Sequence, residues 1–131
     1  MKEVREMAET IAGKKLVVVV THGLDDPEKA TLALVVANAA LTMDVEVTVV
    51  FQGKGVMCCT KGMYEHIVAP GLKPLKELVD GLPALGAKMF VCIPCIEERK
   101  ITKEQLVEGC ELVKAGKLVN EVMRADQVMV Y

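Results

Sequence analysis

The strongest constraint on the fold is an unbroken run of apolar residues, Leu-Val-Val-Val-Val, at positions 16–20. A strand that is apolar without alternation is typical of a parallel sheet, because helices cover both of its faces. Apolar runs at 45–51 and 88–92 have the same character, and shorter runs occur at 111–113 and 127–131. The sequence therefore predicts about five strands.

Helical patterns separate these strands. Asp26 is suited to cap a helix, Pro27 suits the first helical position, and the apolar pattern continues to about residue 43. Thr102 and Gln105 form a capping-box pattern, which predicts a short helix that ends at Gly109. Helical spacing also occupies residues 2–12, 74–85 and 116–125.

Strands that alternate with helices build βαβ units, and right-handed crossovers place helices on both faces of the sheet. We therefore predict a three-layer α/β/α fold with a mostly parallel sheet, flavodoxin-like or Rossmann-like. The chain has 131 residues, close to the usual size of one domain. We expect a single domain over residues 1–131, with residues 1–14 as an N-terminal helical extension.

Composition narrows the class of function. The chain is 52% hydrophobic but only 3% aromatic, which predicts an aliphatic core and some apolar surface for a subunit interface. The net charge is -2, and acidic and basic residues are spread along the chain. No basic stripe forms, so we expect no nucleic-acid partner. No signal peptide or membrane span is expected. The five Cys are therefore predicted to be reduced thiols in the cytoplasm.

The most informative thiols are Cys92, at the end of a predicted strand, and Cys95, three residues later. Ligands of open parallel sheets bind beyond the carboxyl ends of the strands. Backbone N–H groups at the start of a helical turn stabilise thiolate, so we expect a lowered pKa for Cys92. Arg99, one helical turn after Cys95, would add positive charge. The alternative is that Cys92 is a small apolar residue at a buried strand end.

A second candidate position follows the first strand, where His22 and Gly23 stand. An imidazole at a strand end suits an acid–base or anion-binding role, and the alternative is a loop residue bonded to nearby backbone. In a flavodoxin-like order the strands at 16–20 and 88–92 are neighbours. On that order we expect His22 and Cys92 to open into one pocket.

The remaining cysteines are interpreted as structural. Cys58 and Cys59 are adjacent in a Gly-rich loop and are read as thiols without a role, and Cys110 as a core residue. A zinc site that joins them to Cys92 and Cys95 is disfavoured, because adjacent residues chelate poorly. We therefore expect no metal.

Three segments resemble one known family. They are Val-Thr-His-Gly at 20–23, Gly-Ala-Lys-Met-Phe-Val-Cys at 86–92 and Ala-Asp-Gln-Val-Met-Val-Tyr at 125–131. In order and spacing they resemble the DsrE/DsrF-like family of small sulfur-relay proteins, which includes TusD and YchN-like members. The resemblance covers nearly the whole chain from Lys15 onward.

The resemblance implies a cysteine-based sulfur carrier. In the family, a Cys at the end of the third strand accepts sulfane sulfur, as a persulfide or thiosulfonate, and passes it to a TusA-like partner. Cys92 matches that Cys, and Cys95 matches a second Cys of YchN-like members. Arg99 matches a family Arg, and Lys100 stands where many members have Gly. The resemblance also implies a homotrimer or homohexamer.

The sequence thus predicts a sulfurtransferase-like carrier, rather than a turnover enzyme, that needs no organic cofactor. Arg99, His22 and backbone N–H groups would stabilise the anionic sulfur. One alternative is a dithiol redox or sensor protein that uses Cys92 and Cys95. Another is a non-catalytic oligomeric module that binds a ligand. Flavin binding is disfavoured because the loops lack a phosphate cradle, and the Cys pattern of peroxiredoxins is absent.

Overall fold

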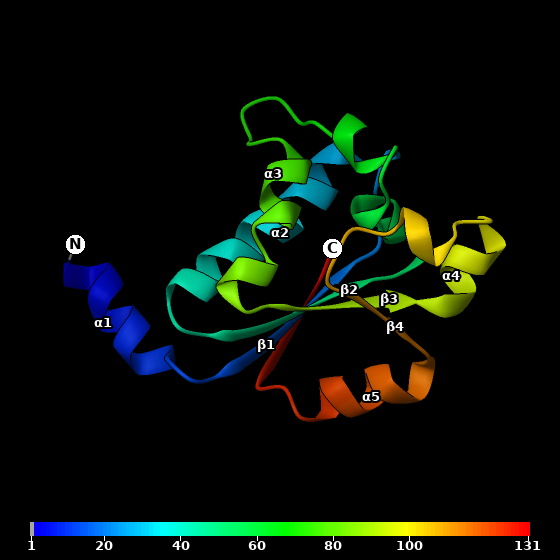
Figure 1. Cartoon of the computed structure of the whole chain (residues 1–131). Helices are drawn as coiled ribbons and strands as arrows, with labels where there is room; N and C mark the ends of the chain where they lie inside the picture. The colour runs from blue at the N-terminus through cyan, green and yellow to red at the C-terminus, as the bar shows by residue number, and fades with distance from the viewer. Residues whose placement is uncertain (1) are drawn as a thin grey trace.

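The computed structural model describes residues 2–131 and confirms an α/β fold (Figure 1). Over these residues, five parallel strands form one sheet in the order β4-β3-β2-β1-β5. The strands are β1 (Lys15–Val20), β2 (Glu46–Phe51), β3 (Lys88–Cys92), β4 (Cys110–Val113) and β5 (Gln127–Val130).

Helices cover both faces of the sheet, so the predicted three layers are confirmed. Helices α2 and α3 lie on one face and α5 on the other, while α1 extends away from the sheet (Figure 1). The α-helices are α1 (Lys2–Ile11), α2 (Pro27–Thr42), α3 (Leu75–Asp80), α4 (Ile93–Glu98) and α5 (Ala115–Met123). Short 3-10 helices are η1 (Gly53–Cys59), η2 (Tyr64–His66), η3 (Pro83–Leu85) and η4 (Lys103–Gln105).

Two helix signals turn out as follows. Asp26 caps α2, where its side chain accepts a hydrogen bond from the Lys29 N–H at 3.0 Å. The Thr102 capping box is also present, and the Thr102 N–H donates to Gln105 Oε1 at 2.8 Å. The helix that it opens is η4, a single 3-10 turn, so the prediction of a helix reaching Gly109 is wrong in length.

The valine run of β1 divides its side chains between two cores. Val18 and Val20 face the larger core under α2, and Val17 and Val19 face a smaller core under α5. Each is at most 7% exposed, and full burial of such a side chain contributes roughly 1.5–3 kcal/mol. The expectation of a strand buried on both faces is confirmed.

The flavodoxin-like strand order, in which β1 and β3 would be neighbours, is wrong, because β2 lies between them. The chain steps from β1 to β2, β3 and β4 in one direction. Right-handed crossovers in a constant direction stay on one face, and α5 crosses the other face to return the chain to β1. His22 and Cys92 therefore do not extend from neighbouring strands.

A buried ion cluster ties α5 to the amino ends of the strands. Glu121 is 5% exposed, and its Oε1 lies 2.6 Å from Lys15 Nζ, 2.9 Å from Thr48 Oγ1 and 3.8 Å from Lys88 Nζ. Burial alone would raise the pKa of Glu121, but the hydrogen bonds from Lys15 and Thr48 and the charges of both lysines lower it overall. Glu121 is therefore ionised and paired inside the protein.

Across residues 2–131, none of the helices has both the length and the apolar character needed to cross a membrane.

Candidate functional site

Two thiols stand at the carboxyl end of β3. Cys92 is the last residue of β3 and the N-cap of α4, and Cys95 lies in the first turns of that helix beside Pro94. Both cysteines are partly exposed, and the Cys95 thiol is close enough to affect the pKa of Cys92. The structure thus brings the two predicted sulfur atoms together at an accessible position.

A backbone donor from the neighbouring strand reaches this pair. Gly53 follows β2, the neighbour of β3, and its N–H donates to Cys95 Sγ at 3.2 Å. Gly53 has φ +57°, in the left-handed region that glycine adopts without strain. A fixed N–H donor favours negative charge on the sulfur that accepts it.

The expectation of a lowered pKa at Cys92 is wrong. Burial at the sheet end raises the pKa of this thiol, and its interaction with the Cys95 thiol raises it further. The Cys95 backbone N–H and the Arg99 charge act in the opposite direction but do not prevail. Desolvation therefore outweighs the start of a short helix.

Arg99 lies at the end of α4, as predicted, but part of its guanidinium is already hydrogen-bonded within the chain. Its Nη1 donates to the Cys95 carbonyl oxygen at 3.0 Å, and the residue is half-buried. Its positive charge nevertheless acts on the Cys92 sulfur. The next residue, Lys100, has φ +55°, a glycine-like backbone conformation at a lysine.

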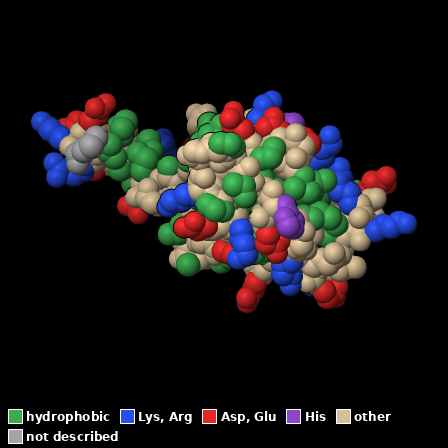
Figure 2. Space-filling model, turned by 90° about the horizontal axis from the view of Figure 1, so that it is seen from above, with side chains coloured by type: hydrophobic (Ala, Val, Ile, Leu, Met, Phe, Trp, Pro, Cys, Tyr) green, Lys and Arg blue, Asp and Glu red, His purple; other side chains and the backbone are tan. Residues whose placement is uncertain are grey.

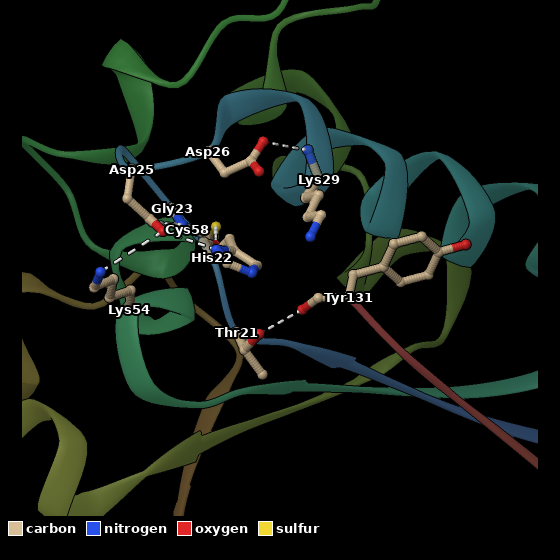
Figure 3. A network of polar contacts seen from close by, with 9 residues as sticks. All are labelled: Thr21, His22, Gly23, Asp25, Asp26, Lys29, Lys54, Cys58 and Tyr131. Atoms are coloured by element: carbon tan, nitrogen blue, oxygen red, sulfur yellow. Dashed lines mark hydrogen bonds and ion pairs between the residues drawn. The ribbon is translucent and has the colours of Figure 1, made fainter.

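A second polar cluster follows β1 (Figure 3). His22 Nδ1 lies 2.7 Å from Asp25 Oδ2, and the Gly23 N–H donates to Asp25 Oδ1 at 2.8 Å. Lys54 Nζ lies 3.8 Å from Asp25 Oδ2. The Gly23 N–H, with the contribution of His22, outweighs burial and lowers the pKa of Asp25 to about 2. Asp25 thus fixes the orientation of the imidazole through Nδ1.

The segment η1 connects the two clusters. Its Gly53 contacts Cys95 and its Lys54 pairs with Asp25. Any Cβ at Gly55 would collide with the Val20 carbonyl, so only glycine lets η1 pack this closely on the end of β1. Sequence reasoning did not predict the contacts that Gly53, Lys54 and Asp25 make; the glycines directly after a strand were the available signal.

Of the other cysteines, Cys58 and Cys59 are buried in η1, and Cys110 is partly buried at the start of β4. The Cys58 thiol donates to the His22 carbonyl oxygen at 3.2 Å, and burial, with the charge of Asp25, raises its pKa to about 12. The Cys59 thiol donates to the Val56 carbonyl oxygen at 3.3 Å, and burial and its interaction with the Cys110 thiol raise its pKa. The same interaction lowers the pKa of Cys110, which packs against the larger core as expected.

Cys58, Cys59 and Cys110 therefore form a group distinct from the thiols of Cys92 and Cys95. Among residues 2–131, no group of three or more His, Cys, Asp or Glu side chains is placed to hold a metal ion.

Comparison with protein families decides the relationship. The DsrE/DsrF-like family matches residues 14–131. The chain belongs to this family. The DsrE/DsrF-like family is related to sulfur-relay proteins, and its match leaves out α1.

Curated relatives are archaeal and uncharacterized. MJ0760 of Methanocaldococcus jannaschii is 29% identical over 112 residues, which are 86% of this chain but 41% of that protein. MJ0989 of the same organism is 31% identical over 89% of this chain and 99% of its own length. MK0008 of Methanopyrus kandleri is 30% identical over 88% of this chain and 93% of its own. The chain thus spans less than half the length of MJ0760 and nearly the whole length of MJ0989 and MK0008.

Solved structures agree on the fold. YchN of E. coli superposes with a TM-score of 0.64 at 18% identity, over 91% of this chain and 99% of YchN. MTH1491 of Methanobacterium thermoautotrophicum, a protein of unknown function, superposes with a TM-score of 0.66 at 17% identity, over 90% of this chain and 99% of its own. At these identities the likeness shows a shared fold.

Proposed function

We propose that this protein is a sulfur carrier, which accepts sulfane sulfur on Cys92 and Cys95 and passes it to a TusA-like partner. The observation that carries the proposal is the half-exposed thiol pair, with the Gly53 N–H directed at Cys95 Sγ. Sulfur transfer needs an accessible thiolate and a means to hold charge on sulfur. Membership of a family related to sulfur-relay proteins supports the same chemistry.

Cys95 is the better candidate for first acceptor. In the proposed step, the Cys95 thiolate attacks the outer sulfur of a donor persulfide R–S–SH. The donor S–S bond breaks, R–S⁻ leaves, and Cys95 carries –S–SH, with no net oxidation. The Gly53 N–H supports the charge on Cys95 Sγ before attack. The raised pKa of Cys92 favours its thiol form, whose S–H can support the charge on Cys95 Sγ.

Charged groups around the thiols would guide an anionic donor. His22 and Lys54 are both paired with Asp25, in the cluster that η1 connects to the thiols. Arg99 adds positive charge at Cys92. We propose that these groups attract persulfide or thiosulfonate donors rather than take part in bond exchange.

The setting of the carrier is part of the proposal. We propose a single domain with α1 as an extension, assembled as a homotrimer or homohexamer. A cytoplasmic location follows from thiols that must stay reduced to act. Bound organic cofactors and nucleic acids have no part in this chemistry.

A second candidate is a dithiol redox or sensor protein. The closeness of the Cys92 and Cys95 thiols favours it, because neighbouring thiols can form a disulfide when an oxidant such as a polysulfide is present. In that reaction both thiols lose hydrogen and the polysulfide is reduced to hydrosulfide.

Intact mass spectrometry separates the two candidates. The native protein is incubated with thiosulfate, tetrathionate or polysulfide, beside the variants Cys92→Ser, Cys95→Ser and, as matched control, Cys110→Ser. We expect a reducible adduct of one or more sulfur atoms, or of thiosulfonate, that Cys95→Ser abolishes and Cys110→Ser retains. An adduct would then move to a TusA-like protein on mixing.

Two results would contradict the carrier. Loss of two hydrogens without added sulfur, dependent on both Cys92 and Cys95, would favour the redox protein. No change on any variant would favour a module without sulfur chemistry.

A further inference from the structure

Helix α1 presents an apolar stripe that nothing in its own chain covers. Val4, Met7, Ala8 and Ile11 recur at helical spacing and share one face, called here the α1 stripe. None of the residues Lys2–Ile11 is buried, and Val4 and Met7 are 42% and 46% exposed. Figure 2 shows α1 extending from the body with hydrophobic side chains on its surface.

The length of α1 makes a partner necessary. A helix of ten residues is marginal in water, because isolated helices shorter than about 12–15 residues lack the bonds to offset nucleation. Helices of this size owe their stability to the packing of an apolar face. The α1 stripe supplies such a face, and the described chain gives it no surface on which to pack beyond the contact of Ile11 at its root.

A matching groove lies on the body of the molecule. Its volume is about 440 Å³, and it runs between α2 and the edge strand β5. Its walls are mainly apolar and include Leu16, Val36, Ala39, Met43 and Met129. Helix α2 contributes to the groove because its apolar residues lie all around the helix. A helix with only one buried face would carry polar residues on its solvent-facing side.

The strand beside the groove is also unprotected. β5 is at an edge of the sheet, and all four of its residues are exposed. An apolar edge strand is a liability unless another surface covers it. Val128 and Val130 are 39% and 67% exposed on the opposite face from Met129. The groove and the free edge of β5 are therefore both left open to a protein partner.

We propose that α1 is an exchanged arm, whose stripe seats in the α2–β5 groove of a second copy of this chain. One exposed cation suits this occupant: α1 carries Glu3, Glu6 and Glu9 against Lys2 and Arg5, and Lys14 stands exposed at the groove rim. The other charged rim residues are already engaged, Lys15 by Glu121 and Asp126 by the Lys15 N–H. Both surfaces are present in every copy, so the exchange can close on itself. The arm gives a contact to the self-assembly proposed above and does not depend on the sulfur chemistry.

Two other occupants fit the observations less well. A membrane surface attracts amphipathic helices with basic polar faces, whereas the polar face of α1 has three glutamates. The chain's own groove begins at Ile11, but α1 leaves it at Gly13, which has φ +82° and donates its N–H to Asp44 O at 2.9 Å. After that turn α1 extends away from the body (Figure 1).

Light scattering of the full chain over a concentration series tests the arm. Met7→Glu places a charge in the stripe and Ala39→Glu places one in the groove; both positions are exposed in the single chain. Lys2→Gln, on the polar face of α1, makes the same one-unit change in net charge and is the matched control. We expect wild type and Lys2→Gln to assemble, and both glutamate variants to assemble at least about ten-fold more weakly.

Cross-linking identifies which copy provides the groove. Protein labelled with ¹⁴N and with ¹⁵N is refolded together, and carbodiimide links between α1 glutamates and Lys14 are read by mass. Mixed-isotope links are expected. Same-isotope links alone would overturn the proposal in favour of the chain's own groove. Unchanged assembly of Met7→Glu would overturn it as well, and so would a monomeric wild type that binds anionic vesicles through Met7.

If Met7→Glu retains the sulfur adduct and its melting temperature is unchanged, the sulfur chemistry does not depend on the exchanged arm. Loss of the adduct in wild type would refute only the carrier.

Discussion

The two ends of the sheet use charged residues in opposite ways. At the amino ends, Glu121 is buried and fully engaged by Lys15, Thr48 and Lys88. At the carboxyl ends, polar groups and thiols stay partly exposed, and Asp25 is occupied mainly in orienting His22. A cluster that satisfies itself leaves nothing to offer a substrate. Accessible groups held by fixed partners are therefore the better mark of a functional site.

The largest effect is expected at the carboxyl end, from Cys95→Ser. Removing the sulfur that accepts the Gly53 N–H should reduce sulfur loading by at least about 100-fold, because serine is a far weaker nucleophile near neutral pH. The melting temperature should change little, since Cys95 is only half-buried. Loading measured by intact mass that persists in this variant would move the acceptor to Cys92.

The largest effect on stability is expected at the amino end, from Glu121→Gln. The substitution leaves Lys15 without its buried partner, and we expect a loss of roughly 2–3 kcal/mol in the free energy of unfolding. Urea denaturation measures it. Because the folded pKa of Glu121 is lowered, its contribution is present above the unfolded pKa of about 4.3 and is lost as the pH falls through the folded value.

The difference in the free energy of unfolding between Glu121→Gln and wild type should therefore become smaller in acid. Sulfur loading of the folded variant should be unchanged. A variant that lost loading but kept its stability would break the contrast between the two ends.

A smaller effect is expected for Asp25→Asn. Asparagine keeps a hydrogen-bonding side chain beside His22 but removes the charge that fixes the imidazole. If His22 helps to receive an anionic donor, the rate of loading should change by about 3- to 10-fold, with a shifted pH profile. Mass spectra of samples quenched at timed intervals, taken over a series of pH values, give both the rate of loading and its pH profile. An identical rate and profile would confine His22 and Asp25 to a structural role.

The smallest effect is expected for Lys100→Gly. Lys100 has φ +55°, where a side chain is strained, and glycine should stabilise the protein by about 0.5–1 kcal/mol. This is a gain at the carboxyl end, beside α4, with no change in burial. Thermal unfolding would detect it, and a lower melting temperature would mean that the Lys100 side chain contributes contacts that outweigh the strain.

Local signals in the sequence predicted the elements well. The valine run gave β1, and the side chain of Asp26 marked the start of α2, because strand burial and helix capping depend on near neighbours. The order of the strands could not be predicted in the same way. β1, β2 and β3 have similar apolar residues, and nothing local states which of them pairs with which.

The candidate site was predicted in outline and missed in its detail. Cys92 and Cys95 followed from their place after a strand, but the sign of the pKa change at Cys92 depends on burial, which spacing does not reveal. The contact of Cys59 with Cys110 joins distant segments, as does that of Gly53 with Cys95. Such pairs appear only when the strands are placed.

The path of the chain also shapes how the sheet forms. Pairing of β1 with β2 closes a loop that contains one helix, whereas the pairing of β1 with β5 joins residues about 110 positions apart, such as Thr21 and Tyr131. Closing so long a loop carries the larger entropic cost. β5 is also exposed along its length, so its amide hydrogens should exchange with solvent before those of β1 and β2.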